Sequence, residues 1–110
     1  QLSNPVVALG SLSVESTPTE FALLQNFPNP FNPETTIKYN VASGSNVSLR
    51  IYNVVGQVVR TLVAEQQNAG RYTVRWNGSD DRGVSVSSGI YFYQISAGDF
   101  SDVKKLMLLK

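Results

Sequence analysis

Oxygen-bearing side chains gather at one point of this sequence, the segment Asn77 to Gly83, where Asn77, Asp80 and Asp81 follow closely on one another. Carboxylate and amide oxygens are the ligands that calcium prefers, so these residues resemble half of a calcium-binding loop. The alternating ligand spacing and the closing bidentate glutamate of such a loop are missing. We therefore expect a solvated turn, in which these side chains accept hydrogen bonds from nearby backbone amides, and no bound metal.

Histidine and cysteine are absent from the 110 residues. Their absence removes the Ser-His-Asp and Cys-His catalytic arrangements, histidine and thiolate metal sites, and disulfides. An enzyme here would have to use carboxylates alone. Four acidic residues lie beside turn or strand-end signals: Glu34, Glu65, Asp80 and Asp102. Nothing in the sequence raises the pKa of any of them, as the acid of a glycosidase requires. We expect no enzymatic activity and no cofactor.

Aromatic residues suggest a different chemistry, because a flat aromatic surface can bind a sugar ring. Tyr52 and Trp76 are the candidates for such a platform, with Tyr91 and Tyr93 as further aromatic residues at alternating positions. In a β-sandwich, however, aromatic side chains at alternating positions more often pack in or beside the core. Core packing is therefore the preferred interpretation, and carbohydrate binding is kept as an alternative function.

The charge balance and the apolar runs exclude two classes of partner. The net charge is +1, with 9 Lys and Arg against 8 Asp and Glu and no basic stripe, so a nucleic-acid partner is not expected. The longest unbroken apolar run, Leu106 to Leu109, is far shorter than a membrane span. The sequence begins at Gln1 without a charged-then-apolar leader, which suggests a piece of a longer protein.

Alternating apolar and polar residues predict antiparallel strands. The central feature is a hairpin over Asn46 to Val63, in which Asn53 begins a type I turn and Gly56 closes it in the left-handed conformation. The returning strand has an ambiguous phase, because Val58/Leu62 and Val59/Val63 both look apolar, and we expect a β-bulge there. Further strands are predicted at 35–41, 72–76, 90–97 and 100–109, with a short strand at 84–86 as an option and Gly98-Asp99 as a two-residue hairpin turn.

Three prolines stiffen the segment Phe21 to Pro33, FALLQNFPNPFNP, and exclude a helix or a central strand there. Phe27 and Phe31 are spaced to place their rings on an apolar surface. We expect the segment to clamp one end of the domain, rather than to act as an exposed proline-rich ligand. Residues 1–20 are rich in Ser, Thr and Pro and predict a linker, with an edge strand at 6–9 as the alternative.

These strands, without any helical periodicity, predict an all-β domain over residues 21–110 that folds as an antiparallel β-sandwich of about seven strands. We expect its core to contain Ile37, Tyr39, Leu49, Ile51, Val74, Trp76, Tyr91 and Tyr93.

Four short motifs occur in a fixed order: NPFNP at 29–33, IYN-x-x-G at 51–56, WNG at 76–78 and SGIYFY at 88–93. Together with their surroundings, from Phe21 to Lys110, they resemble a type A C-terminal sorting domain of the type IX (Por) secretion system. The segment is also similar to the related Ig-like module of the flagellar hook-capping protein. The resemblance implies an Ig-like sandwich at the C-terminus of a larger secreted protein, which is often a hydrolase. It also implies that the outer-membrane translocon reads the domain, and that a sortase commonly removes it and links the cargo to surface lipopolysaccharide.

The terminal pattern of this family, a lysine, an apolar run and a final basic residue, falls on the last strand. The resemblance places this pattern on Lys105, Leu106, Met107, Leu108, Leu109 and Lys110, and together with the adjacent Lys104 these are the expected recognition residues. If the outer side of this strand is free, a receptor can add a strand to it. The lysines would then discourage aggregation and also offer charge to an acidic receptor surface.

The function expected on these grounds is a non-catalytic C-terminal sorting module of an exported protein, secreted or held at the cell surface after passage through the periplasm and outer membrane. Its expected partners are the upstream catalytic or binding domain of the same polypeptide, the outer-membrane secretion machinery and a sortase, and the domain itself is expected to be a monomer. The alternative is a carbohydrate-binding or structural Ig-like accessory module of a secreted glycoside hydrolase.

Overall fold

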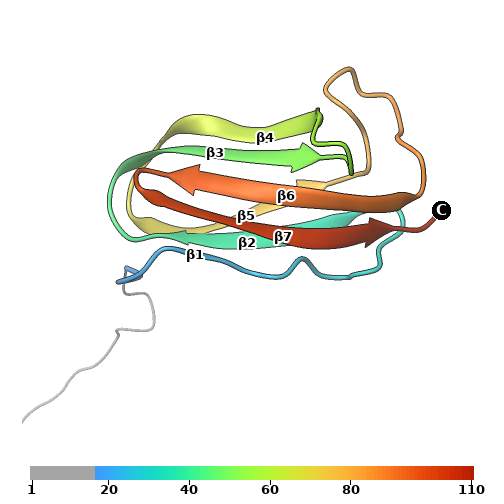
Figure 1. Cartoon of the computed structure of the whole chain (residues 1–110). Coiled ribbons are helices and arrows are strands. Elements are labelled where there is room, and N and C mark those ends of the chain that lie inside the picture. The colour runs from blue at the N-terminus through green and yellow to red at the C-terminus, as the bar shows by residue number, and fades with distance from the viewer. Residues whose placement is uncertain (1–16) are drawn as a thin grey trace, which may run out of the picture.

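The computed structural model describes residues 17–110 (Figure 1). Strands are the only regular elements of this part of the chain, and none of its residues belongs to a helix that could cross a membrane. The alternative edge strand at 6–9, and most of the predicted linker, lie outside the described residues. The strands are β1 Ala22–Leu23, β2 Thr35–Val41, β3 Ser45–Tyr52, β4 Val58–Gln67, β5 Gly70–Trp76, β6 Gly89–Ala97 and β7 Phe100–Leu108.

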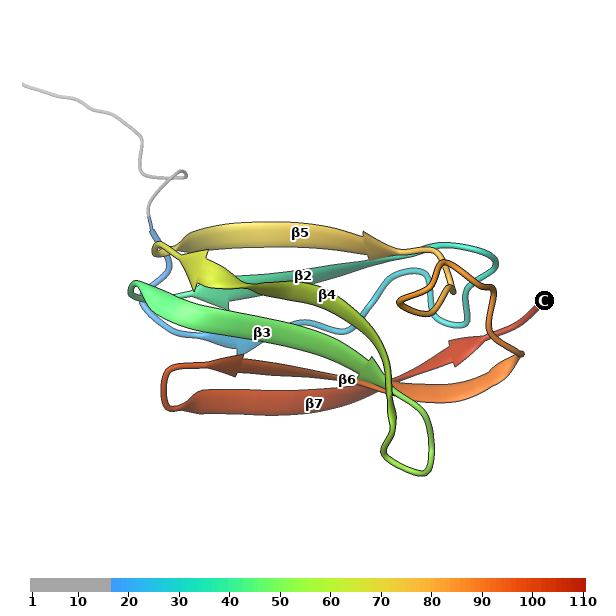
Figure 2. The same cartoon turned by 90° about the horizontal axis from the view of Figure 1, so that it is seen from above.

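The strands form two antiparallel sheets that pack face to face (Figure 2). One sheet has the order β1-β2-β5 and the other the order β4-β3-β6-β7. Every pair of neighbouring strands is antiparallel. The all-β sandwich predicted from the sequence is therefore confirmed.

The core lies between the sheets and is built from alternate residues of each strand, as the period of two requires. Trp76 is 1 % exposed and its ring lies 5.6 Å from both Phe31 and Tyr91, measured between ring centroids. Its indole N–H donates a hydrogen bond of 2.8 Å to the carbonyl of Ser79. All the predicted core residues are buried except Val74, which is half-buried because β5 lies at the edge of its sheet.

The β3–β4 hairpin has the predicted turn. The Gly56 N–H donates to the Asn53 carbonyl at 3.0 Å, and Gly56 has a φ of 85°, which closes the turn in the left-handed region. The register between the two strands then shifts twice, so that Val59 and Leu62 have no partner on β3. The expected bulge is therefore confirmed, although there are two of them and β4 continues beyond the predicted end of the hairpin to Gln67.

Two further connections shape the ends of the sandwich. Gly98 has a φ of 59°, the positive value that a two-residue hairpin turn needs at this position, and it joins β6 to β7. Residues 77–88 form a long loop. The optional strand at 84–86 is absent from it, and an isolated bridge between Ser79 and Ser85 is found instead.

The proline-rich segment passes from one sheet to the other. It first pairs with β2, where Phe27 and Thr36 exchange two backbone hydrogen bonds of 2.9 Å. It then bridges to β7, where the Phe31 N–H donates to the Met107 carbonyl and the Phe31 carbonyl accepts from the Leu109 N–H, both at 3.0 Å. The segment thus closes a long side of the sandwich, and not one end of it as predicted.

Of Phe27 and Phe31, the two phenylalanines that were expected to dock, only one does. Phe31 is 2 % exposed and belongs to the core, as expected, whereas Phe27 is 78 % exposed. The prediction for Phe27 is wrong because pairing with Thr36 on β2 places its side chain on the outer face of the three-stranded sheet.

Candidate recognition surface

The residues of the predicted terminal signal divide between the core and the surface. Leu106 and Leu108 are buried, at 0 % and 1 % exposure, because they face the other sheet. Lys105, Leu109 and Lys110 are exposed, and Lys104 and Met107 are half-buried. Two of the apolar residues therefore hold the fold, and only the remaining side chains are accessible to a partner.

The outer face of the four-stranded sheet surrounds Lys105. Lys105 lies opposite Phe92 of β6, and Phe92 in turn lies opposite Tyr52 of β3. Met107 lies opposite Ile90 in the next row. These neighbours of Lys105 are all half-buried, so the lysine stands beside apolar surface that is partly open to solvent.

The outer edge of β7 is not free in its C-terminal half, contrary to the condition on which strand addition depended. The side-chain amide of Gln25 donates to the Lys105 carbonyl at 2.9 Å, and the Met107 N–H donates to Oδ1 of Asn29 at 2.9 Å. With the two hydrogen bonds of Phe31, the edge is occupied from Lys105 to Leu109 by the protein's own chain. Sequence reasoning missed Gln25 and Asn29. Their only signal was that they are polar residues within the stiff proline-rich segment.

The N-terminal half of β7 carries two charged side chains on its inner face. Lys104 lies opposite Tyr93 and Asp102 opposite Ile95, and both partners are buried. Inward-pointing charges at a sheet edge discourage pairing with other chains. This half of the strand is therefore poorly suited to strand addition as well.

The hydroxyl of Tyr93, on β6, forms two hydrogen bonds with the first part of the proline-rich segment. It accepts a hydrogen bond of 2.8 Å from the Asn26 N–H and donates one of 2.7 Å to the Leu24 carbonyl. Burial raises the pKa of Tyr93 to about 12, an effect that the hydrogen bond from Asn26 partly offsets. The hydroxyl therefore stays protonated and keeps both bonds under ordinary conditions.

The final lysine contacts the 77–88 loop. Its backbone N–H donates to Oγ of Ser88 at 3.1 Å, and its ammonium group donates to Oγ of Ser85. The ion pairs found within residues 17–110 are Arg60 with Asp81 and Arg82 with Asp80, and neither involves a lysine of the terminal strand. The positive charges of Lys104, Lys105 and Lys110 are therefore not neutralised by a described carboxylate.

The Asn77 to Gly83 segment forms the predicted Asx turns. Oδ1 of Asp80 accepts hydrogen bonds from the backbone N–H groups of Arg82 and Val84, at 2.9 and 3.0 Å. Oδ1 of Asn77 accepts from the backbone N–H and the hydroxyl of Ser79. Hydrogen bonds from the Arg82 side chain and then from the Val84 amide lower the pKa of Asp80 below its ordinary value. A carboxyl group held ionised in this way is not suited to act as a general acid.

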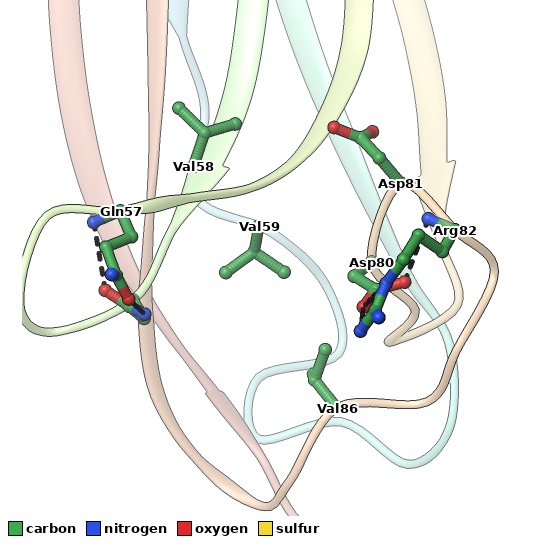
Figure 3. Close-up of a pocket in the computed structure, with 8 residues that line it drawn as sticks. Gln57, Val58, Val59, Asp80, Asp81, Arg82 and Val86 are labelled. Carbon is green, nitrogen blue, oxygen red and sulfur yellow. Dashed lines mark hydrogen bonds and ion pairs between the residues drawn. The ribbon is translucent and has the colours of Figure 1, made fainter.

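Asp81 caps the beginning of the β4 edge. Its N–H donates to the Val59 carbonyl at 3.0 Å, and its Oδ1 accepts from the Thr61 N–H at 2.9 Å. Between this loop and the β3–β4 turn lies a cleft of about 560 Å³, lined by Asn53, Gln57, Val58, Val59, Asp80, Asp81, Arg82 and Val86. In Figure 3 the Arg82 side chain folds onto Asp80, while the Asp81 carboxylate is directed away from both. Within the described range, no three His, Cys, Asp or Glu residues come together as a metal site would need.

The two aromatic residues of the alternative sugar platform do not share a surface. Trp76 is 1 % exposed and faces the core from the three-stranded sheet. Tyr52 is half-buried on the outer face of the four-stranded sheet, opposite Phe92. The structure therefore does not bring these two rings together on one face.

Comparison with known proteins supports the arrangement of the strands. The family model described as the FlgD Ig-like domain matches residues 32–100. No curated protein matches the sequence. Two Porphyromonas gingivalis structures are similar: dimeric latent PorU, with a TM-score of 0.65 and 20 % identity, and PorZ, with 0.55 and 20 %. PorZ is described as an essential bacterial surface component of the type-IX secretion system.

The share of each chain that is covered differs strongly. The match to PorU covers 79 % of this chain and 9 % of PorU, and the match to PorZ covers 78 % and 11 %. FlgD from P. aeruginosa is also similar, with a TM-score of 0.53 and 24 % identity over 67 % of this chain and 58 % of that one. The chain thus spans only about a tenth of the length of PorU and PorZ, and these structural likenesses establish a shared fold.

Proposed function

Because the chain belongs to the FlgD Ig-like domain family, we propose that it is the non-catalytic C-terminal sorting module of a larger exported protein. In this proposal the type IX outer-membrane translocon reads the domain, and a sortase then attaches the cargo to the cell surface. The domain itself performs no chemistry, and its sequence has no histidine or cysteine with which to build the usual nucleophile–base pairs.

The observation that carries the proposal is the likeness to PorZ, which is a surface component of the type-IX secretion system. The likeness covers 78 % of this chain but only 11 % of PorZ, as expected for one small module that is reused within larger proteins. The motifs NPFNP, IYN-x-x-G, WNG and SGIYFY support the same assignment through their resemblance to the sorting-domain family.

The geometry favours recognition of side chains over recognition of the strand edge. The backbone of the last strand from Lys105 to Leu109 is already hydrogen-bonded to the proline-rich segment. Lys105, Leu109 and Lys110 remain exposed, and they combine two positive charges with one apolar side chain. In the proposed complex these three side chains meet an acidic receptor surface.

The proposal is tested by fusing the chain behind a signal peptide and a reporter, in a bacterium with and without a working type IX translocon. The reporter is expected outside the outer membrane in the first strain and inside the periplasm in the second. A reporter without the domain should stay in the periplasm of both. Export that does not depend on the translocon would contradict the proposal.

Charge reversal then tests the recognition residues. The Lys105→Glu/Lys110→Glu double variant should fold normally, because exposed charges contribute little to stability, yet lose export. The matched single variants are Lys105→Glu and Lys38→Glu, which each reverse one exposed lysine, on β7 and on β2. Only the first should reduce export. Wild-type export of the folded double variant would show that the terminal charges are not read.

Deletion of Leu106 to Lys110 is a poor substitute for these variants. It removes Leu106 and Leu108, which are buried in the core, so it should unfold the domain whether or not the terminus is recognised.

A further inference from the structure

Strand β5 is an edge strand whose backbone faces outward on one side. The order β1-β2-β5 leaves no strand of the described chain beyond it. On β2, the backbone groups of Thr36 and Lys38 bond to the segment on the opposite side from β5. The alternate residues of β2 must then bond to β5, so Ile37 exchanges hydrogen bonds with Val74. It follows that the N–H and C=O groups of Arg71, Thr73 and Arg75 point away from the sheet.

These backbone groups have no hydrogen-bond partner among residues 17–110. The other two long edges are treated differently. Phe31 and its neighbours occupy the end of the β7 edge, and Asp81 caps the beginning of the β4 edge. β5 is therefore the edge on which no described segment has been placed.

The side chains of the same three residues lie on the outer face of the three-stranded sheet. Arg71, Thr73 and Arg75 are exposed and lie opposite Asn40, Lys38 and Thr36. Neither arginine forms an ion pair with a described carboxylate. Two positive charges, four positions apart, thus stand beside three sets of free backbone donors and acceptors.

The inner row of β5 is apolar and only half covered. Tyr72 and Val74 face the sandwich and are half-buried. Leu62 and Val63 of β4, the strand that precedes β5 across a short connection, are also half-buried and pack against the same core. A further strand beside β5 would bring its own inward side chains against this apolar surface.

We propose that the edge of β5 binds an extended acidic segment of another protein, which adds to the three-stranded sheet as a fourth, antiparallel strand. Acidic residues at alternate positions of that segment would pair with Arg71 and Arg75 on the outer face. The residues between them would be apolar and would contact Tyr72 and Val74. Charge complementarity decides the partner, because the exposed side chains of this edge are two arginines and a threonine and no acid. The proposal stands whether or not the domain acts in sorting.

The test is a titration of the isotope-labelled full chain with a synthetic peptide, acetyl-Glu-Val-Glu-Val-Glu-amide, followed by amide chemical shifts and hydrogen exchange. Arg71, Thr73 and Arg75 are expected to show the largest shifts and to gain protection from exchange. A peptide of the same sequence in which the central glutamate is N-methylated has the same charge but lacks the N–H that faces Thr73 in antiparallel pairing, so it should bind at least about tenfold more weakly. Acetyl-Lys-Val-Lys-Val-Lys-amide should not bind.

Two protein variants separate the backbone from the charges. Thr73→Pro removes an outward N–H without breaking a bond to β2, and it should abolish binding, whereas Thr73→Ala keeps the N–H and should bind as the wild type does. Arg71→Glu/Arg75→Glu should weaken binding by about tenfold or more. Arg50→Glu, on β3 of the other sheet, is the control for charge and should bind normally.

Three outcomes would overturn the proposal. They are shifts that map to β4 or β7 or do not occur, equal binding of the N-methylated peptide, and undiminished binding by the double arginine variant. If Thr73→Pro does not fold, the two peptides and the arginine variant still decide the question. Equal binding of both acidic peptides would mean that the arginines attract anions without strand addition.

Discussion

The two long sides of this sandwich differ in whether a segment of the chain covers the seam between the two sheets. On the side of β7, residues 22–31 cover the seam, because they pair first with β2 of one sheet and then with β7 of the other. The apolar side chains there are at most 5 % exposed: Leu23, Phe31, Leu106 and Leu108. On the side of β4 and β5 no described segment follows the whole seam, and Tyr72, Val74, Leu62 and Val63 stay half-buried. We call these the closed side and the open side.

The difference shows that topology alone does not identify a free edge. Strand β7 is last in the sheet order β4-β3-β6-β7, yet its outward backbone groups from the Lys105 carbonyl to the Leu109 N–H are bonded to the proline-rich segment. A short irregular segment can thus protect an edge without forming a long strand of its own. The open side keeps unused backbone groups, and it is where we expect another chain to bind.

Polar groups on the closed side are satisfied internally. The Asn26 side chain donates to Oγ1 of Thr35 at 2.9 Å and to the Pro28 carbonyl at 3.1 Å, and Thr35 itself donates to Pro28 at 2.8 Å. In the part of the chain that the structure describes, no buried side-chain nitrogen or oxygen lacks a partner. Satisfied buried networks of this kind fix one arrangement of the chain.

The largest loss of stability is expected for Phe31, the residue of the closed side whose ring packs in the core. Phe31→Ala removes a ring that packs 5.6 Å from Trp76, between ring centroids, and should lower the free energy of unfolding by about 3–5 kcal/mol. Phe27→Ala is the matched control from the same segment, and because Phe27 is 78 % exposed it should change the value by less than about 0.5 kcal/mol. Urea denaturation followed by Trp fluorescence measures both. Equal effects would show that the segment does not close the core.

Removal of one hydroxyl should loosen the closed side by a smaller amount. Tyr93→Phe leaves the Asn26 N–H and the Leu24 carbonyl without their partner, and should cost about 1–3 kcal/mol. Hydrogen exchange should accelerate at Asn26 and Phe31, and not at Val74 on the open side, whose N–H is bonded to Ile37. A uniform increase across the domain would contradict a local role of the hydroxyl.

The same hydroxyl predicts a pH dependence. The folded-state pKa of Tyr93 is about 12, against an ordinary value of 10.0, so its stabilising contribution is complete below pH 10. Between pH 10 and about 12 the unfolded chain loses the proton more readily than the folded chain, and stability falls. The difference in free energy of unfolding between wild type and Tyr93→Phe should therefore narrow over this range. The other tyrosines ionise in both proteins, so their contributions cancel from this difference. A constant difference up to pH 12 would show that Tyr93 titrates normally in the folded state.

The smallest loss of stability is expected for an apolar residue of the open side. Val74→Ala removes a half-buried side chain and should cost about 1 kcal/mol, whereas Ile37→Ala, its direct partner on β2, should cost about 2–5 kcal/mol. Chemical denaturation of both variants makes the comparison. An equal cost would mean that the seam between β4 and β5 is as well packed as the closed side.

The sequence was sufficient for the features that depend on local pattern. The strand at 35–41 has the predicted bounds, and the last two strands differ from their predicted bounds by one residue at one end. The Asn53 to Gly56 turn and the burial of Trp76 were also predicted correctly. Period-two alternation and turn chemistry act over a few neighbouring residues, which is why they can be read from the chain itself.

The accessibility of the candidate site was decided only by the tertiary structure. The bond from the Met107 N–H to Asn29 joins residues that are 78 positions apart, and it exists because the packing of the two sheets brings the proline-rich segment to the β7 edge. No local pattern states which edge that segment will reach, nor that Arg71 and Arg75 will lie on an edge that remains uncovered. The sequence determined which residues face inward along each strand, and the packing of the two sheets determined which backbone groups were left for a partner.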